Sequence, residues 1–93
     1  MPTIWIPALL RPLTGGMDQV AVIGATIEET LDDLDRRYPG VKSRLCAGTD
    51  LRPGLAVVVD GAIVRQGLDH PVRETSEVHF VQAIAGGSSM ITG

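Results

Sequence analysis

Apolar runs bounded by turn residues characterise the first quarter of the chain. Residues 3–6 (TIWI) favour a strand and end at Pro7, which cannot donate a backbone hydrogen bond to a sheet. The strand could resume over residues 8–10. A second apolar run covers residues 19–23, and the glycines at positions 15 and 16 permit the tight turn that would join the two runs. The pattern therefore predicts an N-terminal β-hairpin.

The apolar spacing then changes from that of a strand to that of a helix. Apolar side chains recur at intervals of four, three and four residues, at Ile27, Leu31, Leu34 and Tyr38. Thr26 and Glu29 have capping-box spacing, in which Thr26 accepts from the amide of Glu29 and the Glu29 carboxylate reaches back to Thr26. The acidic first turns, which include Asp33, and Arg36-Arg37 near the other end suit the helix dipole, and Pro39-Gly40 would stop the helix. One amphipathic helix is predicted, and its acidic run needs no catalytic explanation.

A second hairpin is predicted in the middle of the chain. Residues 55–59 form an apolar, β-branched run that is typical of a strand. Asp60-Gly61 follows, and this dipeptide favours a type I′ turn, in which both central residues have positive φ. Residues 63–65 would then be the returning strand.

The stretches on either side of this hairpin lack a clear period. Residues 41–53 indicate a connecting loop with one short turn of helix, and residues 67–77 are polar and rich in turn formers. Residues 78–84 form a last strand, from which the chain continues through Ala85-Gly86-Gly87. The predicted order is ββαβββ, or ββαββ if the short returning strand is discounted.

One helix can cover only one face of the predicted sheet. Because side chains alternate between faces along a strand, the inward-pointing residues would be Ile4, Ile6, Val57, Val59, Val78 and Phe80. The opposite, outer face would carry Trp5, Val58, His79 and Val81. That face must meet water or a partner, and a tryptophan near two valines is unusual on a solvated surface.

The composition limits the class of protein. At 93 residues the chain fits one small domain with few aromatic side chains, so a large catalytic cleft is not expected. The net charge is −3 and the basic residues are scattered, which argues against nucleic-acid binding. No apolar run approaches the roughly 20 residues that span a bilayer, so we expect a soluble, cytoplasmic protein. A single cysteine, Cys46, with His70 and His79, supplies no metal-ligand cluster.

Three segments together resemble a known family. Residues 7–16 (PALLRPLTGG), 55–61 (LAVVVDG) and 78–87 (VHFVQAIAGG) are similar to segments of ubiquitin-like β-grasp sulfur carriers. The family includes the small subunit of molybdopterin synthase and the thiamine sulfur carrier, and the chain most resembles the carriers of cysteine biosynthesis and of siderophore pathways. The resemblance covers residues 3–87. It implies an α+β fold with a mixed four- to five-stranded sheet and one main helix on one face.

The resemblance also implies the chemistry. In this family an ATP-using, ubiquitin-activating-like enzyme adenylates the terminal glycine carboxylate, and sulfur then displaces AMP to leave a thiocarboxylate. Here that carboxylate would belong to Gly87, in the tail Gly86-Gly87. Glycines suit a tail that must thread into a narrow active site. The chain would thus be no enzyme and hold no bound cofactor; it would carry sulfur covalently to an acceptor synthase.

The six residues after Gly87 depart from the family pattern. Residues 88–93 (SSMITG) keep the Gly87 carboxylate in a peptide bond to Ser88. Some siderophore-pathway carriers have such an extension, which a zinc-dependent metalloprotease of the deubiquitinase type removes. We therefore expect a carrier domain at residues 1–87 and a removable extension at 88–93. Alternatives are an addition from cloning, a relative that has lost sulfur transfer, or activation at Gly93.

Two further choices stay open from the sequence. The outer-face residues Trp5, Val58, His79 and Val81 could dock the partner enzymes, or Trp5 could pack against the fold and complete it. The chain could instead be a ubiquitin-like module that conjugates through Gly87 or binds without covalent change. A persulfide at Cys46 is the less favoured reading of a lone loop cysteine.

Overall fold

The computed structural model describes residues 1–64 and 67–82. Its sheet contains five strands, β1 (Thr3–Trp5), β2 (Gln19–Ala21), β5 (Leu55–Val59), β6 (Ala62–Val64) and β7 (Glu77–Gln82). Its helices are a 3₁₀ helix η1 (Ala8–Thr14) and two α-helices, α1 (Ile27–Arg37) and α2 (Val41–Leu45). A separate two-stranded sheet pairs β3 (Cys46–Ala47) with β4 (Asp50–Leu51).

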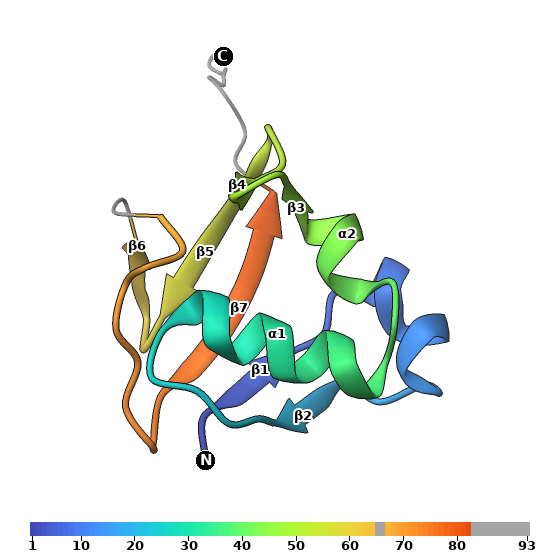
Figure 1. The fold of residues 1–93 in the computed structure, drawn as a ribbon, viewed down its shortest axis with the longest axis horizontal. Helices are drawn as coiled ribbons and strands as arrows, with labels where there is room; N and C mark the ends of the chain where they lie inside the picture. The colour runs from blue at the N-terminus through green and yellow to red at the C-terminus, as the bar shows by residue number, and fades with distance from the viewer. Residues whose placement is uncertain (65–66, 83–93) are drawn as a thin grey trace.

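The strand order of the main sheet is β2-β1-β7-β5-β6. β1 runs parallel to β7, and the other neighbours are antiparallel. Figure 1 shows α1 crossing one face of this sheet. The α+β, ubiquitin-like β-grasp class is confirmed, and the sheet has the larger of the two expected strand numbers.

The segment after the first strand differs from the prediction. Residues 8–10 do not resume a strand but begin η1, and the amide of Leu10 donates to the carbonyl of Pro7 at 2.9 Å. The hydroxyl of Thr14 is buried and lies within hydrogen-bond distance of two backbone carbonyls, that of Arg11 within η1 at 3.1 Å and that of Met17 beyond it at 2.9 Å. η1 ends at Gly15, whose φ of 65° a glycine adopts without steric cost. The proline ring restricts φ at positions 7 and 12 to values close to those of a helix, and the strand prediction, which rested on apolar residues alone, did not take this into account.

One of the two hydrogen bonds predicted for the N-terminal cap of α1 is present. Thr26 accepts from the amide of Glu29 at 3.2 Å, as the spacing predicts. The Glu29 carboxylate instead accepts from the amide of Ala25 at 3.0 Å, so its predicted bond to Thr26 is wrong by one residue.

Residues 41–53 contain more structure than the loop with one helical turn that was predicted. The turn of helix is present as α2, but the β3–β4 hairpin was not foreseen. Its strands have two residues each, with Cys46 opposite Leu51. Alternation cannot be recognised over two residues, so the pattern gave no signal for this hairpin.

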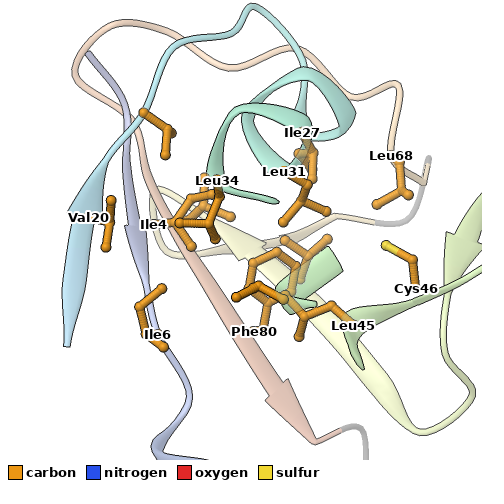
Figure 2. Packing of buried hydrophobic residues seen from close by; sticks show 14 of the residues in the cluster. Ile4, Ile6, Val20, Ile27, Leu31, Leu34, Leu45, Cys46, Leu68 and Phe80 are labelled. Atoms are coloured by element: carbon orange, nitrogen blue, oxygen red, sulfur yellow. The ribbon is translucent and has the colours of Figure 1, made fainter. Parts of the chain in front are cut away.

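The core lies between α1 and the inner face of the sheet. Figure 2 shows Ile27, Leu31 and Leu34 of α1 directed toward side chains from the strands. All six residues predicted to point inward are buried, namely Ile4, Ile6, Val57, Val59, Val78 and Phe80. The alternation rule therefore assigned the inner face correctly.

A buried carboxylate ties α1 to the end of β2. Asp33 accepts from the amide of Ile23 at 3.0 Å and forms ion pairs with Arg36 and Arg37, both at 3.0 Å. The hydrogen bond from Ile23, followed by the two arginines and opposed by burial, lowers the pKa of Asp33 below its ordinary value of 3.8. The helix dipole alone therefore does not explain this residue.

We expect Asp33→Asn to lower the free energy of unfolding at pH 7 by about 2 kcal/mol, because it removes charged hydrogen bonds at a buried position. A depressed pKa stabilises the fold above the unfolded-state pKa, and this contribution disappears as the pH falls through the folded-state pKa. The difference between wild type and variant should thus shrink below about pH 4. Urea unfolding at several pH values measures it. The exposed Asp18→Asn is the control, and an equal loss in both variants would contradict the assignment.

Candidate functional site

Strand β7 leads the chain toward the predicted tail. It is the middle strand of the sheet, and its last residue, Gln82, lies opposite Leu55 of β5. The predicted tail residues Gly86 and Gly87 and the predicted cleavage partner Ser88 lie outside the described residues. The tail therefore stays a prediction, and the site can be described up to Gln82.

An aromatic pair occupies the middle of the outer face. Trp5 of β1 lies opposite His79 of β7, and their rings stack with centroids 5.1 Å apart and an interplanar angle of 9°. The Trp5 indole N–H donates to the Glu77 carboxylate at 3.1 Å. The same carboxylate lies 4.0 Å from Nε2 of His79. The two stacked rings are both half-buried, and the Glu77 carboxylate beside them holds the indole in place.

Apolar side chains extend this surface across the sheet. Val58 lies opposite His79 on one side and opposite Ile63 on the other. Ile63, which was not assigned to the site from the sequence, is 58% exposed. The two-residue turn at Asp60-Gly61 pairs Val59 with Ala62, so it also fixes Ile63 opposite Val58. The two-residue turn could therefore have predicted from the sequence that Ile63 lies on the same face as Val58.

Val81 continues the outer face toward the end of β7. It lies opposite Ala56 and is 42% exposed. The four predicted docking residues therefore do share one face, and we define the outer face as Trp5, Val58, Ile63, His79 and Val81. In the part of the chain that the structure describes, α1 packs on the opposite side of the sheet (Figure 1).

The β5–β6 turn positions the start of β7. Asp60 has a φ of 51°, and Gly61 has a φ of 85°, as the type I′ prediction requires. The Asp60 carboxylate accepts from the amide of Glu77 and from the hydroxyl of Ser76, both at 2.9 Å. These bonds, with that from Glu77 the largest cause, lower the pKa of Asp60. Asp60 thus fixes Glu77, and Glu77 in turn orients Trp5.

Cys46 belongs to the core. It is buried and joins the cluster around α1 and α2 (Figure 2). Burial raises the pKa of its thiol, and Lys42 only partly opposes this shift. A protonated, buried thiol is a poor nucleophile, which favours the packing interpretation over a persulfide.

In residues 1–64 and 67–82, no group of three or more histidine, cysteine, aspartate or glutamate side chains could hold a metal ion. Within the same ranges, no helix has the length and apolar character needed to cross a membrane.

A mixed sheet with a parallel β1–β7 pair, crossed by a helix on one face, defines a ubiquitin-like β-grasp protein. The chain belongs to the ThiS family, which matches residues 4–87. It is 32% identical over 90 residues to the sulfur carrier protein CysO of Mycobacterium tuberculosis and to that of Mycobacterium bovis, covering 91% of this chain and 97% of the relative.

Solved structures agree with this assignment. The chain superimposes on a chain of the Amycolatopsis orientalis BexX/CysO complex with a TM-score of 0.85 and 36% identity, covering 94% of this chain and all of that one. The M. tuberculosis CysO structure gives a TM-score of 0.83 at 29% identity, over 90% of this chain and 100% of that one. Small archaeal modifier protein 1 of Methanosarcina acetivorans, at 20% identity, a TM-score of 0.74 and coverage of 92% and 95%, shares the fold. The chain is a sulfur-carrier protein, a class whose members are not themselves enzymes.

Proposed function

We propose that this chain is the precursor of a thiocarboxylate carrier and that cleavage after Gly87 activates it. One observation carries the proposal: the family match ends at residue 87, which supports a carrier domain that ends there and an extension at residues 88–93. The position of this bond in the sequence also supports it, because it follows the central strand β7 by only five residues.

The proposed reaction has three steps. Water first hydrolyses the Gly87–Ser88 peptide bond and frees the Gly87 carboxylate. That carboxylate attacks the α-phosphate of ATP on an activating enzyme, forming an acyl adenylate and releasing pyrophosphate. Hydrosulfide then displaces AMP and leaves a thiocarboxylate. Alternatively, the persulfide of a sulfur donor displaces AMP to give an acyl disulfide, and a thiol reduces its S–S bond, leaving the thiocarboxylate and a mixed disulfide of the donor and the thiol. The carrier supplies the reacting carboxyl group, and no catalytic side chain of its own takes part.

The outer face would dock the partner enzymes in turn: a ubiquitin-activating-like adenylyltransferase, the zinc metalloprotease that removes residues 88–93, and the acceptor synthase. The stacked Trp5 and His79 offer a rigid aromatic surface, and aromatic side chains are enriched among interface hot spots. The similar CysO from A. orientalis was solved in complex with BexX, which supports partner binding by this kind of domain. ATP would be used by the activating enzyme, and we place these steps in the cytoplasm.

Mass spectrometry of the intact chain tests the sequence of steps. The chain is produced with a candidate metalloprotease alone, and then with the activating enzyme and a sulfur source as well. We expect loss of residues 88–93 in the first case, and in the second also the exchange of one carboxylate oxygen for sulfur. Sulfur on an uncleaved chain would contradict processing, and an isopeptide adduct without thiocarboxylate would select the conjugation module instead.

A further inference from the structure

An apolar pocket lies at the end of β7, where the chain leaves the described domain. Its volume is about 160 Å³, and its walls come from the segment after β1, from α2, from β5 and from β7. The aliphatic and aromatic lining comprises Pro7, Leu9, Leu10, Leu45, Leu55, Phe80 and Val81, and Arg44 and Gln82 complete the pocket. Figure 2 shows Leu45 and Phe80 beside each other at the border of the core. We call this the tail-root pocket.

The rim of the tail-root pocket includes an unusually exposed leucine. Leu9 is 86% exposed, although its neighbour Leu10 is buried. η1 is anchored by Leu10 and by the buried Thr14, so the backbone holds Leu9 outward. A fixed, exposed aliphatic side chain beside an apolar pocket indicates a surface that another apolar group covers.

The chain itself supplies a suitable group. Gln82 lines the tail-root pocket and is followed by residues 83–93. The extension 88–93 is uncharged, and its two large apolar side chains are adjacent, at Met90 and Ile91. Methionine fills irregular apolar gaps readily because its side chain is unbranched and adaptable.

The connection from Gln82 to Met90 is long enough for a return to the tail-root pocket. Its eight steps of extended chain can span up to roughly 26 Å, whereas the pocket begins at Gln82 itself. Gly86 and Gly87 lie in the middle of this connection, and glycine reaches without steric cost the positive φ values that a reversal requires. The entropy cost of closing so short a loop is modest.

We propose that Met90 and Ile91 occupy the tail-root pocket in the uncleaved chain. The extension then has two effects: it blocks the Gly87 carboxylate, and it covers an apolar surface at the root of the tail. Cleavage releases both together, so a partner that binds this pocket distinguishes the processed carrier from its precursor. This regulatory role rests on the proposed processing, whereas the docking itself does not.

Methyl NMR of the full 93-residue chain tests the docking. We expect nuclear Overhauser effects (NOEs) between the Met90 methyl group and the methyl groups of Leu9 and Val81. The double variant Met90→Asp/Ile91→Asp should abolish them and shift the Leu9 and Val81 signals. The matched control Ser89→Asp adds charge to the same segment but keeps the apolar pair, and should retain them. Unchanged core signals from Leu31 will show that each variant is folded.

Two outcomes would overturn the docking. In the first, the Met90 methyl shows no NOE to the pocket, and the double variant leaves the Leu9 and Val81 signals unchanged. In the second, NOEs appear only between labelled and unlabelled molecules, which would assign the pocket to a second copy. Neither readout involves sulfur. Failure of sulfur loading with the NOEs intact would therefore refute only the proposed function, and normal loading without NOEs would refute only the docking.

Discussion

Replacing Gly87 with valine will leave the domain folded and reduce thiocarboxylate formation at least roughly 100-fold, since a small misplacement of reacting atoms can cost this much. The position follows strand β7, and the buried core of the described residues lies within residues 4–80, so we expect folding to be independent of it. A β-branched side chain at the reacting residue restricts φ and ψ and obstructs a narrow active site. The measurement is the intact mass after incubation with protease, activating enzyme, ATP and a sulfur source.

The same substitution at Gly93 is the matched control. Gly93→Val alters a residue that processing removes, so we expect normal cleavage and normal sulfur loading. If Gly93→Val abolished loading and Gly87→Val did not, the activated end would be Gly93 and the precursor hypothesis would be wrong. Because valine at position 87 could also stop the protease, a chain ending at residue 87 carrying the same change separates activation from cleavage.

Trp5→Ala is expected to weaken binding to the activating enzyme by about 2 kcal/mol, or roughly 30-fold in Kd. The indole is the largest side chain of the outer face, and its stacking on His79 and hydrogen bond to Glu77 hold it in place before a partner arrives. Loss of the stack should lower the free energy of unfolding by only about 1 kcal/mol. Calorimetric titration and thermal unfolding measure the two quantities.

Ile23→Ala is the control for Trp5→Ala. Ile23 is 65% exposed, and it adjoins Gly24 and Ala25 before α1, away from the outer face. We expect it to leave the Kd unchanged. A large loss of stability for Trp5→Ala with unaltered binding would instead assign Trp5 to packing, the other role open to it from the sequence.

The outer face was only partly predictable. Period-2 alternation placed Trp5 and His79 on one side of the sheet, and the structure confirms it. It did not predict their stacking, because that depends on the parallel pairing of β1 with β7, two segments at opposite ends of the chain. Ile63 was not predicted to belong to the outer face, although a two-residue turn at Asp60-Gly61 fixes which residue of β5 lies opposite it.

Contacts between side chains of one element and the backbone of another were harder to predict from the sequence. Asp33 was interpreted through its position in a helix, but its buried carboxylate also accepts from Ile23 beyond the end of β2. Asp60 was interpreted as a turn residue, yet it also fixes the start of β7 through Glu77. Each such contact needs a second element whose position the local pattern does not contain.

Local signals in the sequence thus determined the helix and its Thr26 cap, the type I′ turn and the inner face of the sheet, because these depend on neighbouring residues and fixed periodicities. The sequence also determined the family to which the chain belongs. Only the tertiary structure decided the order of the strands, the stacked pair at Trp5 and the pocket below Leu9. These arise from the pairing of distant segments, whose free energy depends on the whole packed core.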